Sequence, residues 1–262
     1  MIDVWHTWSL ALILTAPRIL VAFTVIPVFS QPIFPAMIRN GVMVIISLSL
    51  VPLTKEQLTG ITLDIPMFAL LIFKESVLGL LLGYAMSLPF WAARGAGLVM
   101  DMQRGAMAGM FFSPTLGNMV SPLGNLLGQL AITLVFTSGG FMLLLQTLML
   151  SYQVWPLDKF FPDLTPETAS FFVKQLDVLM YTTLLIAGPF IGIMLIIDIG
   201  TGLVGRYLPQ LNIFLLSMPI KSALVFLILI VYIGIIGRYL HDSFLDFGAN
   251  LNFLHRLVDG GK

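Results

Sequence analysis

The chain has 262 residues and no net formal charge; 58% of its residues are hydrophobic and only 10% are charged. Soluble domains carry about 25% charged residues, so this chain has too little charge to cover a surface that faces water. Cysteine is absent, which excludes disulfides, thiolate metal ligands and a cysteine nucleophile. The composition predicts an integral membrane protein in contact with membrane lipid, and it offers no basic tract for nucleic acid.

Six apolar stretches follow one another along the chain, at residues 8–29, 36–53, 65–93, 123–150, 178–205 and 211–237. Most are long enough for a helix across the hydrocarbon core, which takes roughly 20 residues. They lack the alternation of a membrane barrel. We therefore predict an all-α membrane protein of six to eight hydrophobic helical segments. These form one membrane-embedded domain over residues 1–262, with an amphipathic tail at about 238–262.

Prolines and charges interrupt these stretches. The prolines kink helices because they remove a backbone hydrogen bond, and they include Pro17, Pro89, Pro189 and Pro219. A charge near the middle of a membrane helix is costly unless it is paired or hydrated. The charges within the stretches are Arg18, Lys74, Glu75, Asp198, Arg206 and Lys221. We expect kinked helices in which these side chains form structural ion pairs, although a proton or ion relay would use the same residue types.

Two local patterns predict helix packing and a helix start. Gly79 and Gly83 have the spacing that lets two membrane helices approach closely, and the same spacing recurs at Gly124 and Gly128 and at Gly188 and Gly192. In the more polar stretch 156–177, Thr165 precedes Pro166 as a helix cap precedes a first helical proline. A short amphipathic helix should follow there.

The segment 94–122 differs from the rest of the chain. It contains Arg94, Asp101 and Arg104 together with several glycines and methionines. Such a segment cannot face lipid, because its polar groups and turn-prone backbone would be unsatisfied there. It is therefore buried in protein, lines an aqueous cavity or lies outside the bilayer. Its methionines and phenylalanines suit either a flexible core filler or a deformable apolar seal.

Motifs for catalysis are missing from the sequence. The three histidines, His6, His241 and His255, are far apart and lie in the terminal segments. No HExxH, GxSxG, Walker A or dinucleotide-binding pattern is present. We predict that the chain is not an enzyme and holds neither a cofactor nor a metal ion.

The central motif Gly97-x-x-x-Asp101-x-Gln103-Arg104-Gly105, followed by Ser113-Pro114, resembles the signature of the FliR/SctT family. These proteins are export-gate subunits of flagellar and injectisome type III secretion systems. The resemblance runs from about residue 10 to 240. It extends over Pro17-Arg18, Lys74-Glu75-x-x-x-Gly79-x-x-x-Gly83, Ser138-Gly139-Gly140, Gly202-x-x-Gly205-Arg206-x-x-Pro209-Gln210-x-Asn212 and Pro219-x-Lys221. Arg104 fits the injectisome SctT branch better than the flagellar FliR branch.

The resemblance implies bent helical hairpins within a helical hetero-oligomeric export gate. The implied partners are SctR/FliP-like and SctS/FliQ-like subunits, a SctU/FlhB-like switch protein and a SctV/FlhA-like export component, with unfolded secreted proteins as cargo. The implied location is the bacterial inner membrane, with the multi-pass assembly raised toward the periplasm.

The resemblance also implies roles for particular residues. A loop at about 105–121 would help to plug the pore through Met107, Met110, Phe111, Phe112, Ser113 and Pro114. A brace at the base of that loop would consist of Arg94, Asp101, Gln103, Arg104 and Gly105. Polar contacts between helices or subunits would involve Arg18, Lys74, Glu75, Asp198, Arg206, Gln210, Asn212 and Lys221.

Two other functions are compatible with the residues. A stand-alone proton- or ion-coupled transporter would use Lys74, Glu75, Asp198 and Lys221 as a relay. A purely structural scaffold would leave the segment rich in methionine and phenylalanine outside any pore. The family resemblance favours the export gate.

Overall fold

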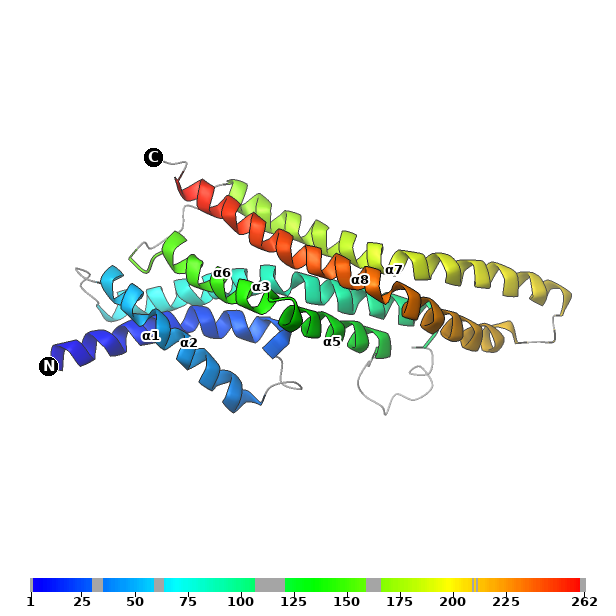
Figure 1. The fold of residues 1–262 in the computed structure, drawn as a ribbon, viewed down its shortest axis with the longest axis horizontal. Helices are drawn as coiled ribbons and strands as arrows, with labels where there is room; N and C mark the ends of the chain where they lie inside the picture. Colours follow the sequence, from blue (N-terminus) through cyan, green and yellow to red (C-terminus); the bar gives the residue numbers. More distant parts are fainter. Residues whose placement is uncertain are drawn as a thin grey trace. The chain divides into compact units, whose positions relative to one another are not determined.

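The computed structural model describes residues 2–29, 35–58, 64–106, 121–158, 166–208, 210 and 212–259 (Figure 1). In this part of the chain every regular element is a helix, as predicted. The elements are α1 (Ile2–Val25), η1 (Pro27–Phe29), α2 (Ala36–Gln57), α3 (Ile65–Gln103), α5 (Pro122–Thr137), α6 (Gly140–Val154), α7 (Pro166–Tyr207) and α8 (Ile213–Asp259).

Five of these helices contain a stretch long and apolar enough to cross a membrane. The stretches are Trp8–Val25, Ala36–Gln57, Ile65–Gln103, Val173–Tyr207 and Leu215–Ser243. Helices α5 and α6 pass the same test together and are bent by 75° at the break between them. Gly139 lies at this break with a φ of 78°, a conformation that side chains with a Cβ rarely adopt. The chain is therefore a multi-pass helical membrane protein.

The described helices group into two compact units. Unit 1 comprises Met1–Leu88, Gly139–Gln175 and Leu245–Lys262, and unit 2 comprises Pro89–Ser138 and Leu176–Phe244. Each boundary within α3, α7 and α8 falls inside a continuous helix, so these three helices contribute to both units. The assignment of the whole chain to one domain stays a prediction.

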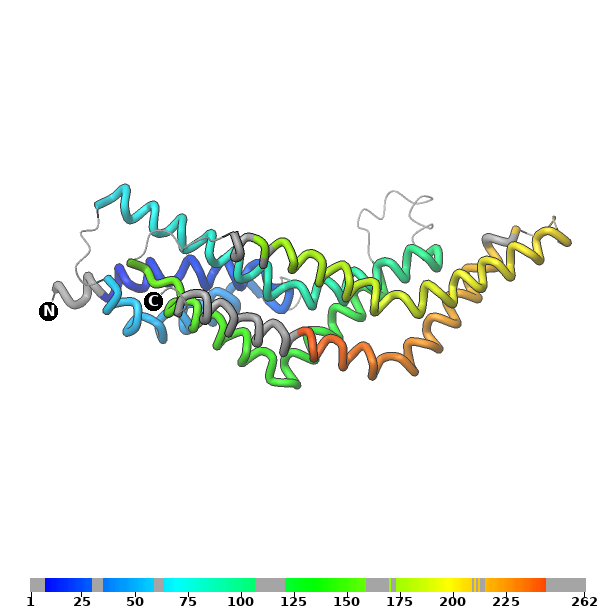
Figure 2. The backbone as a smooth tube through the Cα atoms, turned by 90° about the horizontal axis from the view of Figure 1, so that it is seen from above, coloured from blue at the N-terminus to red at the C-terminus, as the bar shows by residue number. Residues whose placement is uncertain are grey.

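Prolines lie inside the helices without ending them. Pro17 is inside α1, Pro89 inside α3, Pro189 inside α7 and Pro219 inside α8. Each removes one hydrogen bond from its helix, and such positions are where helices bend. The orange part of α8 visibly curves in Figure 2. The predicted kinked segments are thus long helices that continue past their prolines.

The helix predicted after Thr165 is longer than expected. Pro166 is its first residue, as predicted, but the helix continues to Tyr207 instead of ending before the next apolar stretch. The C-terminal tail is likewise continuous with α8 as far as Asp259. In α7 the reason is visible in the sequence, because neither glycine nor proline interrupts residues 167–187. The prediction of a separate short helix is therefore wrong.

Small residues allow the helices of unit 1 to pack closely. A Cβ placed on Gly79 would collide with the backbone carbonyl of Arg18, and one on Gly83 would lie 2.8 Å from the carbonyl oxygen of Ala22. Helix α3 therefore lies directly on the backbone of α1, as the glycine spacing predicted. Helix α1 also packs on α2.

Unit 2 has a glycine contact of the same kind. A Cβ on Gly97 of α3 would collide with the backbone of Leu123 and Gly124 at the start of α5. Helices α7 and α8 contact each other through Phe190 and Tyr232, whose rings meet edge to face at 5.7 Å between centroids. By contrast, no described atom lies within 4 Å of a Cβ on Gly188 or Gly192, so this third glycine pair packs on nothing within the described chain.

Candidate functional site

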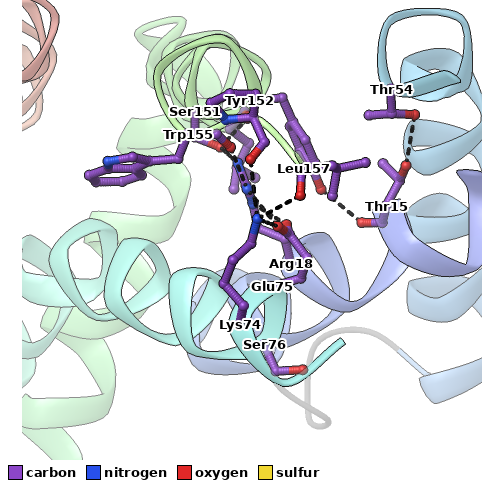
Figure 3. Close-up of polar contacts among 12 residues, drawn as sticks. Thr15, Arg18, Thr54, Lys74, Glu75, Ser76, Ser151, Tyr152, Trp155 and Leu157 are labelled. Carbon is purple, nitrogen blue, oxygen red and sulfur yellow. Dashed lines mark hydrogen bonds and ion pairs between the residues drawn. The ribbon is translucent and has the colours of Figure 1, made fainter. Parts of the chain in front are cut away.

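The most extensive polar cluster in unit 1 is built around an ion pair between α1 and α3 (Figure 3). The Arg18 guanidinium donates from Nε to Glu75 Oε2 at 2.6 Å and from Nη2 to Glu75 Oε1 at 3.0 Å. Both side chains are completely buried. This two-bond geometry is the strong form of an arginine–carboxylate pair. We call this group, together with Lys74 and the residues that bind it, the α1–α3 cluster.

The remaining donors of Arg18 reach α6 and the residues that follow it. Nη1 donates to Ser151 Oγ at 3.1 Å, and Nη2 donates to the carbonyl of Trp155 at 2.8 Å. The guanidinium also lies 4.0 Å from the centre of the Tyr152 ring, a cation–π contact. One buried arginine therefore joins α1, α3 and α6.

Lys74 adds a second cation to the α1–α3 cluster. Its ammonium lies 3.0 Å from Glu75 Oε1 and donates to the carbonyls of Pro156 and Leu157 at 3.1 and 3.2 Å. These carbonyls belong to the chain just after α6, where no helix supplies them with donors. Lys74 thus fixes that short connection on α3.

Neutral hydrogen bonds extend the α1–α3 cluster to α2. The Tyr152 hydroxyl donates to the carbonyl of Thr15 at 2.7 Å, and the Thr15 hydroxyl donates to Thr54 Oγ1 at 3.0 Å. The Gln57 side chain donates to the carbonyl of Tyr152 and accepts from the amide of Leu157. Every polar group of the cluster named here has a partner, which a buried charge requires.

Unit 2 has its own charged centre at the C-terminal end of α3. Asp101 is completely buried. Its Oδ1 accepts from Arg104 Nε at 2.7 Å, while its Oδ2 accepts from Ser121 Oγ at 2.6 Å and from the amide of Leu123 at 2.9 Å. Ser121 in turn caps α5 by accepting from the amide of Gly124. One carboxylate therefore joins both flanks of residues 107–120. We call Asp101, Arg104, Ser121 and Leu123 the loop-base cluster.

The end of α3 has a defined backbone geometry. Gly105 adopts a left-handed φ of 78°. Its amide donates to the carbonyl of Met102, and the amide of Ala106 donates to the carbonyl of Asp101. This pair of bonds is a Schellman motif, for which glycine is the preferred residue. Gly105 thus turns the chain out of α3.

A second ion pair in unit 2 lies beside this turn. Lys221 of α8 pairs with Asp198 of α7 and donates to the carbonyl of Gln103 at 3.2 Å. Gln103 therefore contacts Lys221 through its backbone carbonyl. Arg104 lies next to the same helix, since its Nη1 is 3.5 Å from Ser222 Oγ and its guanidinium is 5.6 Å from the Phe226 ring centre.

The other predicted residues within the described part of the chain lie outside these clusters. The Arg94 side chain is exposed and forms no hydrogen bond or ion pair with the described residues, so it takes no part in the loop-base cluster. Arg206, Gln210 and Asn212 are exposed where α7 ends and α8 begins; Asn212 accepts from the amide of Leu215 at 3.4 Å. The residues predicted for the pore plug lie outside the described part of the chain: Met107, Met110, Phe111, Phe112, Ser113 and Pro114.

Several residues of the two clusters were not predicted. Ser121 had a signal in the sequence, because serine directly before a proline is the pattern of a helix cap followed by the first helical residue. Ser151, Tyr152 and Gln57 had none, since single polar residues in an apolar stretch do not identify their partners. Among the described residues, no group of three or more histidine or acidic side chains could hold a metal ion.

The fold and the clusters define a class of protein, a helical membrane protein with buried charges at helix contacts. Residues 9–247 match the family model of bacterial export proteins, family 1. The chain is 37% identical over 220 residues to the Yop proteins translocation protein T of Yersinia pestis, covering 84% of each chain. It is 27% identical over 235 residues to the flagellar biosynthetic protein FliR of Bacillus subtilis, covering 89% of this chain and 90% of FliR.

A third relative is the surface presentation of antigens protein SpaR of Salmonella typhimurium, 27% identical over 216 residues, which are 82% of this chain and 80% of SpaR. The chain belongs to the bacterial export proteins, family 1, and the resemblance to the FliR/SctT family is confirmed. It is a component of a protein export apparatus. The higher identity to the translocation protein agrees with the prediction from Arg104.

Proposed function

We propose that this chain is a non-enzymatic subunit of a type III secretion export gate, in which residues of about 105–121 contribute to the plug of the pore. The observation that carries the proposal is the position of Asp101, which binds Arg104 on one flank of residues 107–120 and Ser121 and Leu123 on the other. Both flanks of this segment are thus fixed to one buried carboxylate.

The composition of the held segment suits a seal. Residues 107–120 read MAGMFFSPTLGNMV and contain no charged side chain. Methionine is unbranched and polarisable, so it can repack around objects of different shape. The proposed plug residues are Met107, Met110, Phe111, Phe112, Ser113 and Pro114. Such a seal excludes ions while the gate is closed and adapts to an unfolded chain during export.

The partners of the proposed gate are SctR/FliP-like and SctS/FliQ-like subunits in the bacterial inner membrane, with the assembly raised toward the periplasm. SctU/FlhB-like and SctV/FlhA-like components complete the export machine. Gly188 and Gly192 support such assembly, because no described atom of this chain occupies the space beside them. Without side chains at these positions, a helix of a neighbouring subunit can approach the backbone of α7 closely.

The test of the plug is a shortening of residues 106–116 in the complete export apparatus. The proposal expects that the shortened protein assembles at the normal level and that the membrane becomes permeable to small ions. A shortening of residues 159–165, which lie in another connection, is the matched control and should leave the membrane tight. A shortened complex that assembles fully and stays tight would exclude the plug.

The partners are tested by purifying a tagged copy in mild detergent and identifying the co-purified chains by mass spectrometry. The proposal expects SctR- and SctS-like chains in fixed ratio to this subunit. A stand-alone ion-coupled transporter instead predicts transport by the purified single chain in liposomes. The contacts of Glu75 do not favour that alternative, because both of its oxygens are occupied by Arg18 and Lys74.

A further inference from the structure

We propose that Lys221 of α8 is a positioning residue that holds the C-terminal turn of α3, and through it the loop-base cluster. This inference rests on the gate function proposed above and assigns the contact that sets where the plug segment begins. The turn comprises Gln103, Arg104 and Gly105, and all of its contacts described below lie within unit 2.

One face of α8 contacts this turn along its whole length. Met218, Lys221, Ser222 and Phe226 are spaced by three, one and four residues, so they lie along one side of the helix. Each of the four touches a residue of the turn. Lys221 binds the carbonyl of Gln103, Ser222 and Phe226 adjoin the Arg104 guanidinium, and Met218 packs on Gly105.

The contact of Lys221 with Gln103 satisfies a specific need. The last carbonyls of an α-helix lack intrahelical donors and carry the negative end of the helix dipole. The Schellman bonds use the carbonyls of Asp101 and Met102 but leave that of Gln103. The Lys221 ammonium donates to it at 3.2 Å, and the residue is buried. A cation is the group that such a position binds best.

The packing at Gly105 leaves little freedom for the turn. A Cβ at this position would lie 2.9 Å from Met218 Cε, so α8 fits directly against the glycine. Arg104 is held between Asp101 on one side and α8 on the other. A shift of α8 relative to α3 therefore moves the Arg104 guanidinium relative to Asp101. Asp101 needs this positive charge in order to hold both flanks of residues 107–120.

Asp198 completes the arrangement by orienting Lys221 from α7. Its side chain is 38% exposed, whereas that of Lys221 is 9% exposed. Lys221 could in principle serve only to neutralise Asp198, and its bond to Gln103 would then be incidental. The two roles differ in one respect: neutralisation survives an exchange of the two charges, whereas the bond to the Gln103 carbonyl requires a donor at position 221.

The decisive variants are Lys221→Met, Lys221→Arg and the exchange Asp198→Lys with Lys221→Asp, each in the complete export apparatus. Loss of a charged hydrogen bond changes a two-state equilibrium by about tenfold, so we expect Lys221→Met to raise ion leak by about tenfold while the complex still assembles. Lys221→Arg retains the donor and should stay tight. The exchange should assemble and leak, because an aspartate at 221 repels the Gln103 carbonyl. Arg238→Met, at an exposed cation of the same helix, is the matched control.

A second measurement does not depend on the pore. The chain has no cysteine, so Ser222→Cys introduces a single reactive group beside Arg104. In the Lys221→Met background its reaction with a maleimide should be about tenfold faster than with Lys221 present, because the turn no longer covers it. Unchanged labelling, or a tight and fully assembled charge exchange, would overturn the positioning role. A tight complex after shortening of residues 106–116 would instead exclude the plug, and the labelling would still decide the role of Lys221.

Discussion

Glu75 and Asp101 are both completely buried carboxylates on α3, and each pairs with an arginine. Each also has a glycine one helical turn away, where a backbone from another part of the chain lies directly on α3. Gly79 accommodates the carbonyl of Arg18, and Gly97 accommodates Leu123 and Gly124. The two centres are thus built in the same way. The glycine beside each carboxylate has no side chain, so the backbone of another segment comes close enough for its residues to bind the carboxylate.

The two centres differ in how far along the chain their partners lie. Glu75 binds Arg18, 57 residues before it, and Arg18 in turn binds Ser151, which is 133 residues after Arg18. Asp101 binds Arg104 three residues away and Ser121 twenty residues away. The α1–α3 cluster therefore fixes helices that are distant in sequence, whereas the loop-base cluster fixes the two ends of one segment. Breaking the first should affect the fold, and breaking the second should affect mainly the segment.

The largest effect should follow from Glu75→Gln. The change leaves Arg18 and Lys74 buried without a negative charge, and breaking a buried ion pair costs about 3–5 kcal/mol. We expect little folded protein in the membrane and a large drop in the unfolding midpoint in detergent. Asp64→Asn removes an exposed carboxylate and serves as the control. Normal accumulation of Glu75→Gln would show that the α1–α3 cluster does not hold the helices together.

A smaller effect is expected from Asp101→Asn. An asparagine oxygen can still accept from Ser121 or Leu123 but no longer pairs with Arg104, so we expect a loss of about 2–3 kcal/mol. The protein should accumulate and assemble, while protease cleavage within residues 107–120 becomes faster. The control is Asp177→Asn, at an exposed position of α7. If Asp101→Asn reduced accumulation as strongly as Glu75→Gln, the contrast between the two centres would fail.

Gly79→Ala tests the backbone approach that the α1–α3 cluster needs. The added methyl group collides with the carbonyl of Arg18, and overpacking of this kind costs about 2 kcal/mol. We expect a lower unfolding midpoint in detergent. Gly188→Ala is the matched change, because no described atom lies near that position and the midpoint of the isolated chain should not fall. Equal midpoints for the two variants would argue against close contact of α1 and α3.

The smallest effect should come from Tyr152→Phe. The change removes the hydrogen bond to the carbonyl of Thr15 but keeps the ring that lies against Arg18. A single neutral hydrogen bond contributes about 1 kcal/mol, so the unfolding midpoint should fall slightly while assembly stays normal. Tyr181→Phe, at a side chain that is 69% exposed, is the control. A loss as large as that of Glu75→Gln would mean that the hydroxyl, and not the ion pair, holds the cluster.

Much of the fold follows from local features that the sequence displays. Apolar stretches and the scarcity of charge predict a helical membrane protein, and the spacing of Gly79 and Gly83 predicts a close helix contact. The length of α7 was missed because a change in polarity after residue 177 looks like the end of a helix, whereas the backbone continues wherever no residue breaks it.

The sites were harder to predict, for a physical reason. Arg94, Asp101 and Arg104 are close in sequence and of matching charge, yet only Asp101 and Arg104 meet. Arg94 lies on the same face of α3 as Asp101 but two helical turns earlier, about 10 Å along the axis, and its side chain is exposed. Which charges on one helix find a buried partner depends on where the neighbouring helices end and turn, and the apolar residues around α3 do not reveal this.

The sequence by itself determined the class of this protein, the kind of residues that carry its charges and its membership of an export family, because composition and motifs are properties of the chain alone. Only the tertiary structure decided that Arg18 pairs with Glu75, that Ser121 donates a hydrogen bond to Asp101 and that Lys221 binds the end of α3. Ion pairs and caps of this kind depend on distances of a few ångströms between helices, and those distances follow from how closely the backbones can pack.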